Sequence, residues 1–67
     1  MASRKQLVRR LKALRNEQGL SQAALAQKAN LAREFLARLE LGQHDPSLST
    51  LSKLAKALKV KISEMLE

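Results

Sequence analysis

Apolar residues recur every three or four positions along the chain, and short polar breaks divide this helical pattern into five segments. The first segment begins after Ser3, which stands three residues before Gln6 with the spacing of a capping box. Its apolar stripe consists of Leu7, Val8, Leu11 and Leu14. We expect Gly19 to end this helix, because glycine readily takes the left-handed conformation found after helix ends.

Two shorter helical patterns follow, and only Asn30 and its two successors separate them. Ser21 is a favourable N-cap for the first of the two. Its inner side consists of Leu25, Ala26 and Ala29. Asn30 is expected to stop this helix, since asparagine tolerates the left-handed conformation better than most residues. The next helix is predicted to start near Ala32 and to end at Gly42.

The segment Gln43–Pro46 is expected to be a loop, because proline cannot continue a helix. Ser47 then caps a predicted fourth helix, which ends at a break near Lys59. Its apolar stripe consists of Leu48, Leu51, Leu54, Ala55 and Leu58. A short fifth helix holds Ile62, Met65 and Leu66. No segment alternates long enough to form a strand, so the pattern predicts an all-α, compact bundle of five short helices in one domain, residues 1–67.

Size and composition limit how such a bundle is stabilised. A chain of 67 residues buries only about 60% of the surface that it exposes when unfolded. It has no cysteine and one histidine, which excludes a disulfide framework and the usual zinc patterns, and no cofactor is expected. Because Phe35 is the only aromatic residue, the core must consist mostly of leucine and alanine.

The charge of the chain points to a polyanionic partner. Its formal net charge is +7 and its pI is about 10.7, which favours nucleic acid, an anionic membrane or an acidic protein. A solvated basic face without a partner is the simpler alternative. No apolar run is long enough to span a membrane and no signal-peptide core follows the basic N-terminus, so we expect a cytoplasmic protein.

The predicted helix between Ala32 and Leu41 has two different faces. A helical wheel gathers Phe35, Leu36 and Leu39 in one arc, which is expected to pack against the preceding helices. The opposite arc holds Arg33, Glu34, Ala37, Arg38 and Leu41. The hydrophobic-staple spacing of Leu31 and Leu36 supports a tight connection to the helix before it.

This outer arc suits a helix that enters the major groove of DNA. Arginine can donate two parallel hydrogen bonds to guanine, as predicted for Arg33 and Arg38, and alanine can touch a thymine methyl group, as predicted for Ala37. Glu34 is expected to accept from cytosine or to orient an arginine. The alternative is a surface charge network, but the tight helix break and the basic surroundings favour base recognition.

The start of the second predicted helix is a candidate binding site for a phosphate group. The residues Ser21–Ala23 present unpaired backbone N–H groups at the positive end of a helix dipole. Gln22 extends an amide from the same end and is predicted to contact a phosphate. Taken alone, however, Gln22 is better explained as an ordinary exposed glutamine.

The stretch GLSQAALAQKANLAREFLARLELGQHDPSLSTLSKLAKAL closely resembles the helix-turn-helix domain of Cro/CI-type (Xre-like) phage and bacterial repressors. The resemblance covers residues 7–66 and rests on GLSQ–LA–KA, on the spacing of Arg38 and Glu40 before Gly42, and on PSL–TL–KLAKAL. It implies a lambda-repressor-like fold in which the second helix crosses the DNA backbone and the third lies in the major groove.

The resemblance also implies roles for residues outside the third helix. Gln43 and His44 would contact phosphates from the loop that runs along the DNA backbone, although His44 by itself is better explained as a solvent-exposed loop histidine. Arg15 and Glu40 match positions that the family often joins by a salt bridge. One departure is Ala32, where the family usually has serine or threonine, so the third helix should lack a side-chain cap at a cost of about 1 kcal/mol.

A homodimer is the other implication of the resemblance, with the C-terminal helix as its interface. The candidate residues are Ile62, Met65 and Leu66. The alternative is that these three side chains only close the core of the monomer.

The predicted function is a sequence-specific transcriptional regulator of double-stranded DNA, most consistent with a repressor that binds a palindromic operator. Phosphate contacts would supply most of the affinity and the third helix the specificity. No constellation of catalytic residues is present, so an enzyme is not expected. Two alternatives stay open: an antitoxin-like adaptor that mainly binds a partner protein, and a basic membrane-surface or nucleic-acid coat protein that recognises no sequence.

Overall fold

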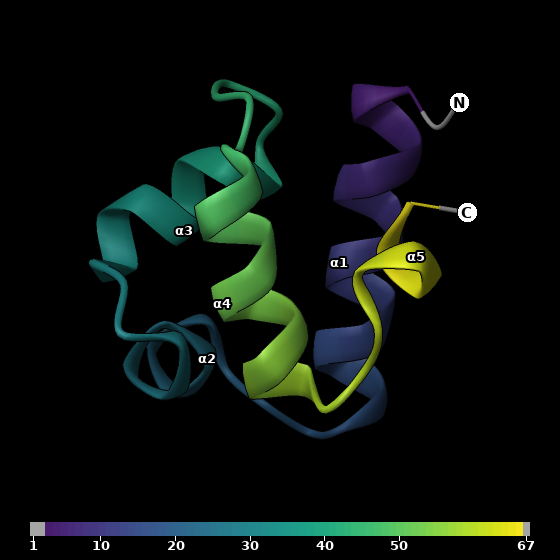
Figure 1. Ribbon diagram of the computed structural model, residues 1–67. Coiled ribbons are helices and arrows are strands. Elements are labelled where there is room, and N and C mark those ends of the chain that lie inside the picture. The colour runs from purple at the N-terminus through teal and green to yellow at the C-terminus, as the bar shows by residue number, and fades with distance from the viewer. Residues whose placement is uncertain (1–2, 67) are drawn as a thin grey trace.

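The computed structural model describes residues 3–66 and confirms the all-helical prediction, since every regular element in that range is an α-helix. The elements are α1 (Arg4–Glu17), α2 (Gln22–Ala29), α3 (Arg33–Glu40), α4 (Leu48–Leu58) and α5 (Ile62–Met65). Figure 1 shows α4 with α2 and α3 on one side and α1 and α5 on the other. The helix-turn-helix pair is α2 and α3, as predicted.

Serine side chains cap three of the helices, as their positions in the sequence predict. Ser3 and Gln6 form a reciprocal capping box at the start of α1. Ser21 accepts a hydrogen bond from the backbone N–H of Ala24, and Ser47 accepts one from that of Thr50. The start of α3 differs, because Ala32 has no side-chain oxygen to accept such a bond. Nothing in the side chain of Ala32 therefore stabilises the first turn of α3.

Left-handed residues end the helices at the predicted positions. Asn30 has φ 57° after α2, and Lys59 has φ 58° after α4. Gly19 and Gly42 also have positive φ, at 67° and 76°. At Asn30 the chain reverses so sharply that the N–H of Leu31 donates back to the carbonyl of Ala26 over 2.8 Å. Only two residues then separate Asn30 from the start of α3.

The core consists of leucine and alanine with one methionine, in agreement with the composition. Its largest fully buried side chains are Leu25, Leu36, Leu54, Leu58 and Met65. The prediction was wrong for Leu48, which lies in the first turn of α4 and keeps 72% of its surface exposed. The apolar stripe of α4 reaches the core only from Leu51 onward.

The three predicted interface residues at the C-terminus differ in how far they are buried. Met65 is fully buried in the core, so its side chain closes the monomer and is not available to a second copy. Ile62 is half-buried against the same core, whereas Leu66 is 42% exposed. Arg10 on α1 links this end of the chain to α1, because its Nε donates a hydrogen bond to the carbonyl of Glu64 over 2.9 Å. Within residues 3–66, no helix is long and apolar enough to cross a membrane.

Candidate nucleic-acid interface

Helix α3 turns the predicted base-reading residues away from the core. Arg33, Glu34 and Arg38 are exposed, and Ala37 is half-buried between them. The side chains of Arg33 and Arg38 have no hydrogen bond or ion pair with any other residue in the range 3–66. The inner arc of α3 packs as predicted: Leu36 and Leu39 are buried and Phe35 is half-buried. The outer face of α3 therefore presents two guanidinium groups that are available to a ligand.

A buried ion pair fixes the end of α3 against α1. Glu40 is the one charged residue that is buried in the described part of the chain, at 4% exposure. Arg15 Nε donates to Glu40 Oε2 over 2.7 Å, and Arg15 Nη2 donates to Oε1 over 2.9 Å. The third donor of Arg15, Nη1, reaches the carbonyl of Leu20 over 2.8 Å. The salt bridge that the resemblance implied is thus present, and it has the bidentate geometry of a strong pair.

Gln22 belongs to the same network, which the sequence did not indicate. Its Nε2 donates to Glu40 Oε1 over 3.0 Å, and its side chain is half-buried at the first position of α2. An amide nitrogen carries two protons, so one N–H of Gln22 is used within the protein and the second remains. Gln22 therefore holds α2 to the end of α3 and can still offer a donor at the predicted phosphate-binding site.

A second link to α1 holds the loop that follows α3. Arg4 donates from Nη1 to the carbonyl of Gly42 over 2.8 Å, and its Nε and Nη2 approach the carboxylate of Asp45 at 2.7 and 3.1 Å. Sequence reasoning did not identify Arg4 or Asp45, since 41 positions separate them and neither belongs to a motif. The Arg4 side chain therefore fixes both ends of the short loop 42–45.

The loop carries the other two predicted phosphate contacts on its surface. Gln43 and His44 are both exposed. The ring of His44 lies beside that of Phe35, with centroids 5.6 Å apart and planes tilted by 44°. Because Phe35 packs against the core from the first turn of α3, this contact places His44 beside that turn. The loop and α3 thus form one continuous surface.

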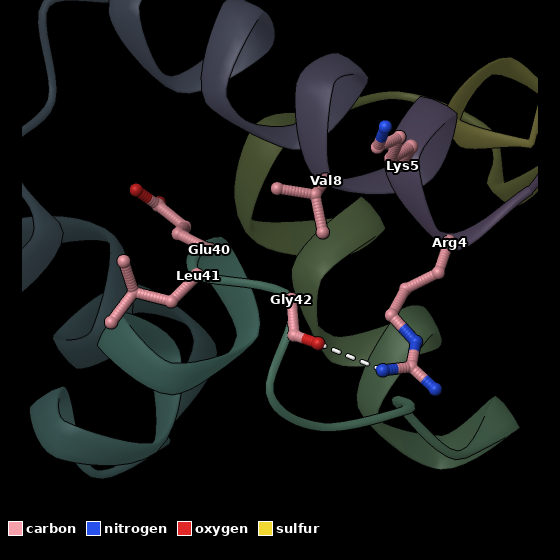
Figure 2. A pocket seen from close by; sticks show the side chains of 6 residues that line it. All are labelled: Arg4, Lys5, Val8, Glu40, Leu41 and Gly42. Atoms are coloured by element: carbon pink, nitrogen blue, oxygen red, sulfur yellow. Dashed lines mark hydrogen bonds between the residues drawn. The ribbon is translucent and has the colours of Figure 1, made fainter.

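A groove lies between the start of α1 and the end of α3. Its volume is about 370 Å³, and Figure 2 shows its lining: Arg4, Lys5, Val8, Glu40, Leu41 and Gly42. Leu41, the C-cap of α3, continues the outer arc of this helix and is 70% exposed. No cluster of three or more metal-ligating side chains occurs among residues 3–66. The groove and the outer face of α3 together present cationic, carboxylate and apolar side chains.

Comparison with known proteins gives the same picture. The helix-turn-helix model HTH_3 matches residues 11–65. The immunity repressor protein of Bacillus phage phi105 is 50% identical over 54 residues, which are 81% of this chain and 38% of the repressor. The HTH-type transcriptional regulator DdrOP3 of Deinococcus deserti is 38% identical over 61 residues, which are 91% of this chain and 47% of that protein. The chain thus spans less than half the length of these two relatives.

A solved structure resembles the whole arrangement. The restriction-modification controller protein C.AhdI from Aeromonas hydrophila superposes with a TM-score of 0.87 at 38% identity, and the match covers 90% of this chain and 91% of that one. The likeness therefore extends beyond α2 and α3 to the helices that support them.

Proposed function

The chain belongs to the HTH_3 helix-turn-helix family, whose members similar to it are transcriptional regulators, and on this premise we propose that it binds double-stranded DNA sequence-specifically to regulate transcription. The observation that carries the proposal is the outer face of α3, where Arg33 and Arg38 are exposed and their guanidinium groups have no partner within residues 3–66. A helix of this kind fits the major groove, where a bidentate arginine distinguishes guanine from the other bases. Glu34 and Ala37 complete the base-reading set.

Phosphate contacts provide the affinity in this proposal. Gln22 offers its second amide proton at the start of α2, and Gln43 and His44 offer side chains from the loop after α3. These groups belong to the helix before α3 and to the loop after it, and contacts of this kind to phosphates fix the position of a protein on the duplex. The net charge of +7 adds an attraction that every duplex shares, whatever its sequence.

We further propose that the protein acts in the cytoplasm as a homodimeric repressor that binds a palindromic operator and catalyses no reaction. The name of the phage phi105 relative, an immunity repressor, supports repression. With Met65 in the core, Ile62 and Leu66 remain as the candidate dimer contacts on α5 and its end. Sedimentation equilibrium of the wild type and of Leu66→Glu tests this point: we expect a dimer that the variant weakens.

Selection from random duplexes at two salt concentrations tests the proposed function. We expect the wild type to enrich one palindrome, whose half-site spacing reports the dimer geometry. Arg38→Ala should relax the preference at one position of each half-site by about 1–3 kcal/mol. Arg9→Ala is the matched control, because Arg9 is an exposed arginine on α1 and should leave base preference unchanged. A loss for Arg38→Ala that is equal on all sequences would contradict base reading.

A further inference from the structure

We propose that the groove between α1 and the end of α3 receives a sugar–phosphate strand of the bound duplex, beside the bases that α3 reads. This inference rests on the proposed function, which places α3 in the major groove. It adds Lys5, Val8 and Leu41 to the DNA-binding surface, although none of them was predicted to contact DNA.

The groove begins where the outer face of α3 ends. On a helical wheel Leu41 falls close to the centre of the outer arc, one turn after Ala37 and Arg38. The same Leu41 side chain lines the groove. The loop residue Gly42 lines it as well, and the following residues Gln43 and His44 are the proposed phosphate contacts. A strand that passes this loop therefore continues into the groove without leaving the protein surface.

The lining matches both components of a sugar–phosphate strand. Val8 and Leu41 contribute apolar surface, which suits the carbon edge of deoxyribose, and Lys5 contributes an ammonium group, which suits a phosphate. Figure 2 shows Lys5 and Val8 on α1, across from Leu41 at the end of α3. Leu41 is one of only three large apolar side chains exposed in residues 3–66, and DNA would cover it in this arrangement.

The charges in the groove leave one cation for the ligand. The Glu40 carboxylate lines the groove but is buried, and Arg15 and Gln22 already donate to both of its oxygens, so it does not repel a phosphate. Arg4 is held by Asp45 and by the carbonyl of Gly42. Lys5 is exposed, and its ammonium group has no hydrogen bond or ion pair with another residue in the range 3–66. Lys5 is therefore the phosphate-binding group, and Arg4 positions the loop beside it.

Salt dependence of binding tests the inference, with Lys5→Ala and Lys12→Ala as a matched pair. Both lysines are exposed on α1, but Lys12 does not line the groove. The measurement is the affinity for the selected duplex and for a random one, by fluorescence anisotropy at several salt concentrations. Lys5→Ala should weaken binding to both duplexes about 3- to 10-fold at low salt and reduce the slope of log K against log salt by about 1. Lys12→Ala should leave the slope unchanged.

Two further measurements distinguish phosphate binding in the groove from a general effect of the protein's positive charge. Ethylation interference on the wild type should reveal a phosphate outside the bases read by α3, and Lys5→Ala should lose sensitivity at that phosphate alone. Leu41→Ala should weaken binding about 2- to 5-fold with an unchanged salt slope, because it removes apolar contact and no charge. Circular dichroism should show Lys5→Ala and Leu41→Ala to be as helical as the wild type, since both side chains lie at the surface.

The outcomes separate this inference from the proposed function. If the wild type selects a palindrome and Arg38→Ala relaxes it, but Lys5→Ala and Lys12→Ala have equal slopes, the groove does not hold the strand and the inference is overturned. That result would be expected if the groove instead held an acidic segment of a protein. If the wild type shows no preference for any duplex, the proposed function fails and the inference fails with it.

Discussion

Two ionic links join α1 to the end of α3, and they have the same shortest distance but opposite surroundings. Arg15 and Glu40 approach to 2.7 Å with side chains that are 14% and 2% exposed. Arg4 and Asp45 also approach to 2.7 Å, but their side chains are 49% and 73% exposed. Both links use the guanidinium group of an arginine on α1 and a carboxylate at or after the end of α3.

The difference shows that burial, rather than distance, decides what each link contributes. Breaking a buried pair leaves one uncompensated charge in the protein interior. When an exposed pair is broken, water solvates the remaining charge at little cost. The position of α3 thus depends on Arg15 and Glu40. The position of the loop 42–45 depends on a weaker link, which salt screens. The proposed base-reading helix is therefore firmly held, and the proposed phosphate-contacting loop can adjust.

The largest expected effect is that of Glu40→Ala, which tests the buried link directly. Because this substitution leaves the largely buried guanidinium of Arg15 without its partner, we expect the free energy of unfolding to fall by about 3–5 kcal/mol. Urea denaturation followed by circular dichroism measures it, and a variant that is already unfolded at 25 °C also meets the expectation. Glu17→Ala, an exposed carboxylate near the end of α1, serves as the control and should change stability by less than about 0.5 kcal/mol. A loss below 1 kcal/mol for Glu40→Ala would remove the contrast between the two links.

A smaller effect is expected when both charges of the buried link are replaced by apolar side chains of similar size. The double variant Arg15→Met/Glu40→Leu leaves no unpaired charge, so only the Leu20 carbonyl and the Gln22 amide lose their partners. We expect it to be about 1–3 kcal/mol less stable than the wild type in the same urea experiment. If it were as unstable as Glu40→Ala, the geometry of the network would matter more than its charge.

The smallest effect should be that of Asp45→Asn, which breaks the exposed link. We expect a loss of at most about 1 kcal/mol in low salt, and no measurable loss near 1 M salt, where the wild-type pair is screened. Thermal unfolding of both proteins at the two salt concentrations checks this. A difference that persists in high salt would mean that the loop is held by more than charge.

Much of the fold could be predicted because local signals determine it. Ser3, Ser21 and Ser47 cap helices through their own side chains, and Gly19 and Asn30 stop helices through their own backbone preferences. These effects need only a few neighbouring residues. The two faces of α3 followed from helical periodicity for the same reason.

Contacts between distant segments could not be predicted in this way. Arg4 reaches Asp45 across 41 positions, and nothing in either residue's neighbourhood indicates the other. The Gln22 amide meets Glu40 only because α2 and α3 pack side by side. Arg15 and Glu40 were anticipated through family resemblance rather than through the pattern. Leu48 shows the limit of periodicity, since its spacing is that of the core but the first turn of α4 extends beyond it.

The contact between Phe35 and His44 gives the protein a built-in spectroscopic reporter. The chain has one phenylalanine, one histidine, and neither tyrosine nor tryptophan, so the aromatic NMR signals come from these two rings alone. Their centroids are 5.6 Å apart, close enough for the ring current of Phe35 to shift the His44 protons. A single pair of resonances therefore follows the loop relative to α3 in solution, and no label needs to be attached near the surface under study.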